Sequence, residues 1–231
     1  MLKYILSFII FALIGIISTG IGGIISYLIN IKNKKVLAVM YEITAGIMTG
    51  IVCFDMIDQG YMLNGIVTSI VGVLIGAIFV FIMSEIIEKK DIKNSNGIAV
   101  TTAMALHNMP EGLAIGASFC ISNSLGINML IAIALHNIPE GIVVGILNKK
   151  EKSIISSIFV GAFLGVGGLI GRVVGELSNF GVSFVLSVAA GAMLYIVACD
   201  LIPNSKKITD KRIISFMYIV GIIIGLILSK N

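Results

Sequence analysis

Long apolar stretches, separated by short polar connections, repeat along the whole chain. At 1.5 Å of rise per residue, each stretch is long enough to cross a bilayer core of roughly 30 Å as a helix. A helix is favoured in lipid because it satisfies its own backbone hydrogen bonds. The pattern therefore predicts eight transmembrane helices, at about 4–29, 36–57, 61–87, 97–120, 126–147, 153–176, 181–203 and 212–229.

The composition excludes the soluble classes of protein. Of the 231 residues, 58% are hydrophobic and 12% are charged, whereas an ordinary globular domain is roughly 45–50% apolar and about 25% charged. Such a chain has too little polar surface for a soluble globule and too few charges for a disordered protein. We expect one all-α, polytopic membrane domain over residues 1–231, embedded in the lipid bilayer of the cell membrane.

Basic residues alternate between the predicted connections. They lie in the first, third, fifth and seventh connections and are absent from the second, fourth and sixth. By the positive-inside rule, the odd connections are cytoplasmic and both termini are outside. Because orientation accounts for these charges, and no basic domain or aromatic platform accompanies them, we expect no nucleic-acid partner. The residues are Lys32, Lys34, Lys35, Lys89, Lys90, Lys93, Lys149, Lys150, Lys152, Lys206, Lys207, Lys211 and Arg212.

Two internal repeats are visible. The segment A-M-A-L-H-N-M-P-E-G-L-A-I-G at 103–116 recurs as A-I-A-L-H-N-I-P-E-G-I-V-V-G at 132–145. A weaker pair, A-G-I-M at 45–48 and A-G-A-M at 190–193, has an offset of 145 residues. Both pairs fall on predicted spans that run in opposite directions, so the copies are inverted. Inverted repeats are typical of secondary transporters, whose substrate site lies near the middle of the membrane.

The H-N-x-P-E-G motif contains both histidines of the chain. Its polar side chains are three or four residues apart and project from one face of a helix. Each copy begins about ten residues, or roughly 15 Å, into its predicted span, close to the middle of the bilayer. The candidate site residues are His107, Asn108, Glu111, His136, Asn137 and Glu140.

Carboxylates at this depth require a partner, and no Lys or Arg lies there. A divalent cation would satisfy them, and a mixture of imidazole, carboxylate and amide groups suits a metal such as Zn²⁺ or Fe²⁺. Two glutamates also leave room for two adjacent metals. Pro110 and Pro139 each free a backbone carbonyl, an irregularity tolerated along an ion pathway. We therefore expect a cation site between spans four and five.

Other interpretations of the motif remain open. The glutamates could be protonated and hydrogen-bonded to the histidines in a closed core, or the groups could relay protons for a proton- or cation-coupled transporter. A membrane protein that senses metal without transporting it is a further alternative. An enzyme is not expected, because the H-E-x-x-H pattern of membrane zinc proteases is replaced by Asn and Glu at its second and fifth positions.

The two motifs resemble those of the ZIP (Zrt/Irt-like) family of divalent metal transporters, and within it the bacterial ZupT-like and GufA-like branch. The resemblance implies an eight-span bundle with both termini outside. It implies uptake of Zn²⁺ into the cytoplasm, with Fe²⁺, Mn²⁺, Co²⁺ or Cd²⁺ as further candidate substrates, and leaves a homodimer open. The six motif residues would match a binuclear site, in which the family often has a span-six glutamate where this chain has Gly168.

Four further residues are candidates for an ion pathway. Asp55 and Asp200, one near each predicted mouth, could attract cations or could be ordinary residues at helix ends. Glu42 enters span two from the predicted cytoplasmic side, and the resemblance matches Met48 to a residue that lines the pathway. Arg172 and Glu176 have the spacing of a structural ion pair.

Overall fold

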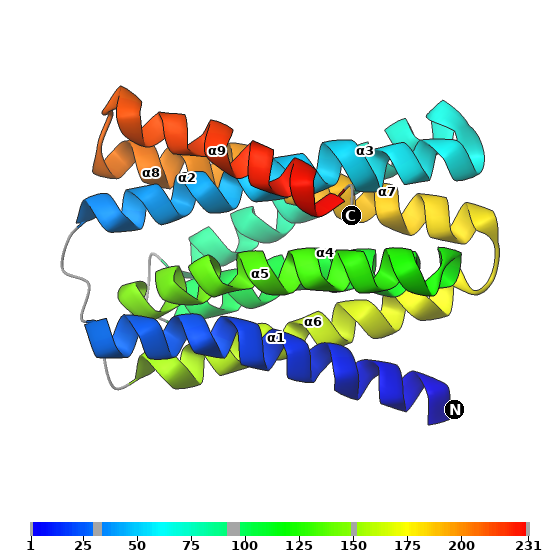
Figure 1. Ribbon diagram of the computed structural model, residues 1–231, viewed down its shortest axis with the longest axis horizontal. Helices are drawn as coiled ribbons and strands as arrows, with labels where there is room; N and C mark the ends of the chain where they lie inside the picture. The colour runs from blue at the N-terminus through cyan, green and yellow to red at the C-terminus, as the bar shows by residue number, and fades with distance from the viewer. Residues whose placement is uncertain (1, 30–33, 92–97, 149–151, 230–231) are drawn as a thin grey trace.

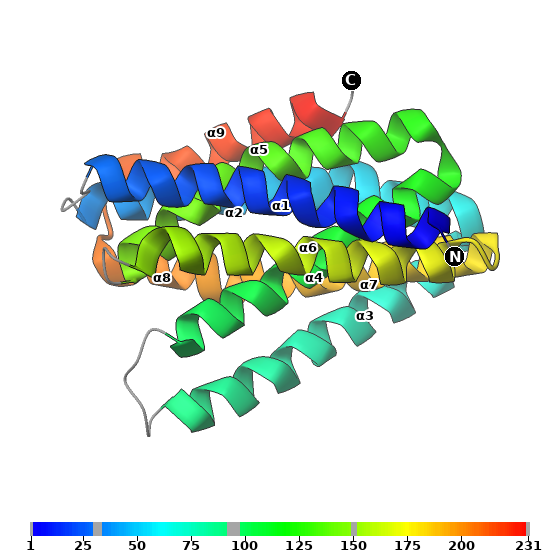
Figure 2. The same cartoon turned by 90° about the horizontal axis from the view of Figure 1, so that it is seen from below.

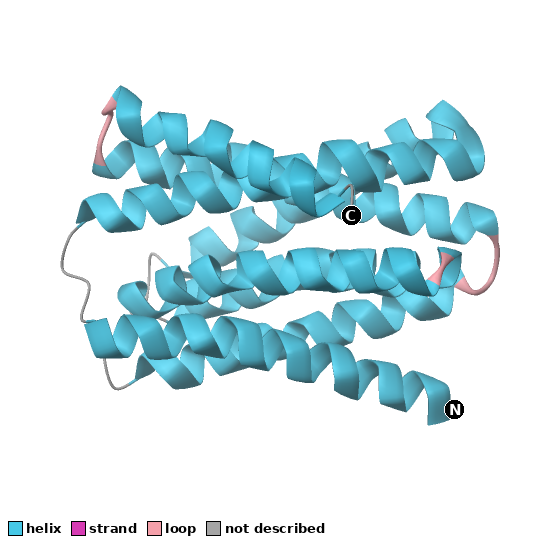
Figure 3. Cartoon of the chain, viewed as in Figure 1, coloured by secondary structure: helices cyan, strands magenta, loops and turns pink. Residues whose placement is uncertain are grey.

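The computed structural model describes residues 2–29, 34–91, 98–148 and 152–229, and within these ranges all regular structure is helical (Figures 1 and 3). The basic connections at 30–33, 92–97 and 149–151 lie outside the described residues. The elements are α1 (Leu2–Ile29), α2 (Lys34–Ile51), η1 (Val52–Met56), α3 (Ile57–Asp91), α4 (Ile98–Ile121), α5 (Asn123–Leu147), α6 (Ser153–Gly175), α7 (Asn179–Ile196), η3 (Val197–Leu201), α8 (Ile202–Ile208) and α9 (Arg212–Ser229).

Six helical stretches of the described chain are long and apolar enough to cross a membrane. The expected all-α, membrane-spanning class is therefore confirmed, whereas the expected count of eight is not. One of the six, at 34–86, has 53 residues and would be about 80 Å long as a straight helix. The others are Leu2–Leu28, Asn123–Leu147, Ser153–Gly175, Asn179–Ile208 and Arg212–Ser229.

A sharp bend interrupts the longest stretch. The backbone leaves the helical region at Asn64 (φ −148°, ψ 20°) and Gly65 (φ 78°, ψ 174°), a conformation that glycine adopts without steric cost. The sequence pattern predicted this connection a few residues earlier, at about 58–60. Those residues are helical because Gly60 packs against α7, where its carbonyl accepts a hydrogen bond from Ser183 Oγ at 2.6 Å.

Two π-helical turns share the offset of the weaker sequence repeat. Turn η1 spans Val52–Met56 and turn η3 spans Val197–Leu201, 145 residues later. Each includes one aspartate of the repeat, Asp55 or Asp200. Figure 1 shows α2 and α7, the helices that precede these turns, running in opposite directions. Such turns inside long helices are often found at functional sites.

The helices form two groups. Helices α1, α4, α5 and α6 pack on one another, and α2, α3, α7, α8 and α9 form the second group (Figures 1 and 2). Helix α4 meets α7, and helix α5 meets α2, where the groups touch. The helix ends that flank the basic connections lie at the same end of the bundle, on the left of both figures. The two motif helices therefore lie in the first group and face the second.

Candidate metal centre

Helices α4 and α5 bring the two copies of the motif side by side. Both prolines, Pro110 and Pro139, lie inside these helices. Each copy presents its histidine and its glutamate one turn apart on one helix face, so the two faces can share a single interior space. All six motif side chains are buried.

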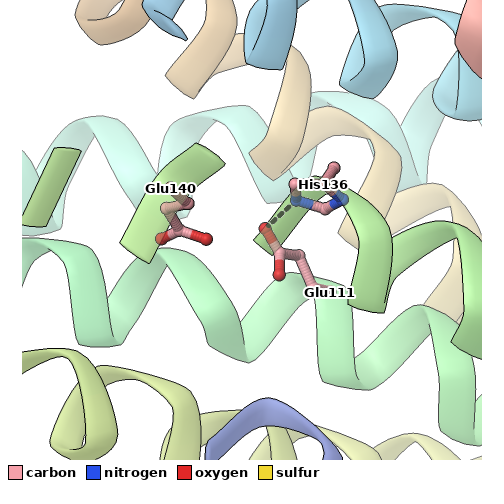
Figure 4. A group of neighbouring side chains, drawn as sticks. All are labelled: Glu111, His136 and Glu140. Atoms are coloured by element: carbon pink, nitrogen blue, oxygen red, sulfur yellow. Dashed lines mark hydrogen bonds and ion pairs between the residues drawn. The ribbon is translucent and has the colours of Figure 1, made fainter. Parts of the chain in front are cut away.

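Three of these side chains form a compact group. Glu111 of α4 and His136 and Glu140 of α5 each offer a ligand atom, and these atoms lie within 4.8 Å of one another. His136 Nε2 is 2.9 Å from Glu111 Oε1. Figure 4 shows this contact and the Glu140 carboxylate facing the same space. Imidazole and carboxylate ligands of this kind suit Zn²⁺.

Asn137 completes the group from within α5. With its side-chain nitrogen turned toward the cluster, it donates to Glu111 Oε2 at 3.0 Å and reaches Glu140 Oε2 at 3.3 Å. With its oxygen turned toward the cluster, the amide would face only acceptors, an arrangement that a bound cation or a protonated carboxyl group would stabilise. The Asn137 side chain thus lies between the two carboxylates and can serve either as a donor or as a ligand.

Several potential ligand atoms around this group have no hydrogen-bond partner. They are buried, and a buried polar atom without a partner is normally costly. A cation bound next to such an acceptor atom would give it a partner. These atoms are His107 Nε2, Asn108 Oδ1, His136 Nδ1 and Glu140 Oε1.

His107 and Asn108 lie beside the compact group without joining its closest atoms. Asn108 Nδ2 donates to the backbone carbonyl of Val160 on α6 at 3.1 Å, which fixes the amide and leaves its oxygen available. The carbonyl of Val160 was not foreseen as a positioning group, because a backbone contact to a distant helix leaves no signal in the sequence. Of the six predicted residues, the structure gathers Glu111, His136, Asn137 and Glu140 most closely.

A pocket connects His107 with one of the predicted pathway residues. It lies between α3, α4 and the end of α7, and His107 and Asp200 both line it. The other lining residues are Phe79, Val80, Met83, Ser84, Leu106 and Ile196. Asp200, a predicted pathway residue, and His107, a motif residue, thus line the same pocket.

The other three predicted pathway residues are buried. Met48 belongs to the hydrophobic core, and Asp55 lies in turn η1. Glu42 is buried in α2, and its Oε1 atom has no hydrogen-bond partner. Neither carboxylate, Asp55 or Glu42, belongs to the compact Glu111–His136–Glu140 group.

A separate charged cluster ties α1 to the end of α6. Lys3 Nζ is 2.6 Å from Glu176 Oε1, and Arg172 Nε is 3.2 Å from the same atom, as predicted for the Arg172–Glu176 pair. Tyr4 donates its hydroxyl to Glu176 Oε2 at 2.9 Å. The hydrogen bond from Lys3 is the main cause that lowers the pKa of the Glu176 carboxyl below its usual value.

A protein family and two zinc transporters are similar to this chain in sequence. The family described as ZIP Zinc transporter matches residues 88–229. The zinc transporter GufA of Myxococcus xanthus is 31% identical over 176 residues, 69% of each chain. The zinc transporter ZupT of Clostridium perfringens (strain 13 / Type A) is 28% identical over 256 residues, 90% of each chain. The extent of these matches, together with the paired motifs at a buried metal-type cluster, shows that the chain belongs to the ZIP zinc transporter family.

Proposed function

We propose that the protein carries Zn²⁺ across the cell membrane into the cytoplasm, and that the ion is bound by the motif residues of α4 and α5. The observation that carries this proposal is the buried group of Glu111, His136 and Glu140, whose ligand atoms lie within 4.8 Å of one another. Glu140 is seven residues from the end of α5, roughly 10 Å along the helix axis. A carboxylate at such a depth requires a compensating charge.

The ligand chemistry favours Zn²⁺ over the hard cations. Mg²⁺ and Ca²⁺ prefer shells made of oxygen atoms alone, whereas the cluster offers an imidazole nitrogen together with carboxylate oxygens. Fe²⁺, Mn²⁺, Co²⁺ and Cd²⁺ can use a similar set, with preferences determined by geometry and availability. They are secondary candidates.

The proposed topology has eight crossings, with both termini outside. The bend at Asn64–Gly65 divides the longest apolar stretch into two helices, each long enough for a bilayer. Helix α4 has 24 residues, about 36 Å of helix, which is also sufficient. The helix ends that flank the basic connections share one end of the bundle, and we assign that end to the cytoplasm.

The proposed mechanism is alternating access around the site. The two helix groups meet at α4–α7 and α2–α5, so a displacement of one group relative to the other would change which side reaches the cluster. The pocket that joins His107 to Asp200 would serve as the route between the site and the cytoplasm.

Reconstitution into liposomes that enclose a zinc-sensitive dye tests the proposal. The wild-type protein should increase dye fluorescence after external Zn²⁺ is added, and His136→Ala and Glu140→Ala should abolish the increase. Glu176→Gln, which removes a carboxylate far from the motifs in sequence, should retain it. Wild-type flux in both site variants would contradict the assignment of the site.

The same vesicles discriminate the alternative functions. A metal sensor would bind Zn²⁺ at equilibrium without admitting it to the lumen. A proton relay would acidify the lumen under a pH gradient with no zinc present, as read by a pH-sensitive dye. Zinc-dependent dye response in the absence of such acidification is the result expected for the transporter.

A further inference from the structure

The part of α6 that packs on α4 beside the cluster is apolar. Asn108 donates a hydrogen bond to the carbonyl of Val160, so Val160 of α6 lies level with the motif of α4. One turn further, a Cβ atom on Gly112 would lie 2.2 Å from the Leu164 carbonyl oxygen, so α4 and α6 touch through their backbones beside Glu111. The side chains of Val160 and Leu164 are fully buried and apolar. At this level α6 therefore supplies no charged ligand.

The next turn of α6 has no space for a ligand either. A Cβ atom on Gly167 would lie 2.0 Å from the Met109 carbonyl oxygen, and one on Gly168 would lie 2.2 Å from Cδ2 of Phe11. Phe11 is itself buried and occupies the volume that a side chain at Gly168 would need. A residue larger than glycine would have to displace the backbone or that ring. The compact group of metal-ligating side chains that the described residues form takes its members from α4 and α5.

The cluster holds two carboxylates, Glu111 and Glu140, among its described residues. The other polar groups of the two motifs are imidazoles and amides, which carry no negative charge. One divalent cation balances two carboxylates and leaves the loaded site neutral. A second divalent cation would leave two positive charges uncompensated in the middle of the bilayer, where a net charge is strongly unfavourable.

The geometry also directs both carboxylates to the same ion. Zn–N and Zn–O bonds are about 2.0–2.2 Å long, so ligands of one ion lie up to about 4 Å apart. The ligand atoms of Glu111, His136 and Glu140 are within 4.8 Å of one another, a spread that small side-chain rotations can close. The neutral amide of Asn137 lies between the two carboxylates, and with its nitrogen turned toward them it donates to Glu111 Oε2 at 3.0 Å and to Glu140 Oε2 at 3.3 Å, so one oxygen of each glutamate already has a partner.

We infer that the site binds a single divalent cation, held jointly by Glu111 and Glu140, instead of a pair of metals. This inference rests on the proposed function, since it concerns the same site. It means that the protein moves one metal ion per transport cycle and that neither carboxylate serves a second ion of its own.

Counting the bound metal tests the inference. The protein in detergent is equilibrated with Zn²⁺, freed of unbound ion, and analysed by mass spectrometry for the number of zinc ions per chain. The wild type should hold one ion per chain, and Glu111→Gln and Glu140→Gln, which preserve side-chain shape, should each lose it. Glu176→Gln is the matched control and should keep one ion.

A titration with ¹¹³Cd²⁺, followed by cadmium NMR, provides an independent count. One saturable resonance per chain is expected. Two ions per chain, or one ion retained at full occupancy in either site variant, would overturn the inference while leaving the transport proposal intact. A wild-type protein that transports no Zn²⁺ and binds none would instead overturn the proposed function itself.

Discussion

Glu111 of α4 and His136 of α5 join the two helices through a 2.9 Å contact between Oε1 and Nε2, with both side chains fully buried. The residues are 25 positions apart and belong to different copies of the motif. The contact orients the carboxylate and the imidazole before a metal arrives, which reduces the ordering needed on binding.

This contact predicts that substitutions of the two residues are not independent. Glu111→Gln and His136→Gln should each weaken Zn²⁺ binding by at least about tenfold, roughly 1.4 kcal/mol. The double variant should be about as weak as the weaker single variant, because each single change already removes the shared ion and the mutual contact. Dissociation constants measured for the four proteins by competition with a zinc chelator give the coupling energy. Strictly additive losses would contradict the shared site.

Close backbone packing predicts a contrast between two glycines at the α1–α6 interface. A Cβ atom on Gly161 would lie 2.2 Å from the Gly15 carbonyl oxygen, whereas the nearest atom to a Cβ on Gly20 is Ile158 Cγ1 at 3.5 Å. Gly161→Ala should therefore destabilise the protein by about 1–3 kcal/mol through overpacking. Gly20→Ala should remain within about 1 kcal/mol of the wild type, because alanine favours the helix.

Thermal unfolding of both variants in detergent, followed by circular dichroism, measures the contrast. A clear fall in the midpoint for Gly161→Ala alone is expected. Equal midpoints for the two variants would mean that α1 and α6 can separate without cost at this interface.

The apolar pattern predicted the all-helical, membrane-spanning class because the bilayer imposes it. Length and hydropathy set the segments, and motif spacing placed Glu111 and His136 on facing helices. The bend at Asn64–Gly65 was missed although Asn-Gly is a turn signal, because the polar residues a few positions earlier gave a more prominent break. The chain does not turn at 58–60, because Gly60 is held against α7 by the hydrogen bond from Ser183.

Other features depend on long-range packing and leave no local signal. The π-helical turns at 52–56 and 197–201 fall in apolar sequence that an ordinary α-helix would also accept. The hydrogen bond from Asn108 to the Val160 carbonyl depends on the offset between α4 and α6. The filling of the space at Gly168 by Phe11 likewise requires the position of α1. None of these features can be predicted from the spacing of residues within one helix.

The pocket shared by His107 and Asp200 predicts a separation between binding and transport. Asp200→Asn should reduce zinc flux into liposomes several-fold, because the proposed route loses a negative charge that attracts the cation. Its zinc affinity at equilibrium should match the wild type, since Asp200 is outside the compact ligand group. Asp210→Asn, which removes an exposed carboxylate after α8, is the control and should affect neither quantity. A loss of affinity in Asp200→Asn would instead make Asp200 part of the binding site.

The cluster around Glu176 predicts a pH-dependent contribution to stability. Lys3, hydrogen-bonded to Glu176, lowers the pKa of this carboxyl in the folded protein. A lowered folded pKa stabilises the fold at pH values above the ordinary glutamate pKa, and this stabilisation is lost as the pH falls through the folded value. Because the cluster is partly exposed, the effect should be small and should weaken in high salt.

Glu176→Gln isolates this contribution from that of the other carboxylates. Its unfolding midpoint should be below that of the wild type at pH 7, and the gap should narrow as the pH is lowered through the acid range. Tyr4→Phe, which removes only the hydroxyl donor to Glu176 Oε2, should show a smaller gap with the same direction. Thermal scans of the three proteins between pH 7 and pH 3 measure these differences. A gap for Glu176→Gln that stays constant across this range would show that the carboxylate's charge does not stabilise the junction between α1 and α6.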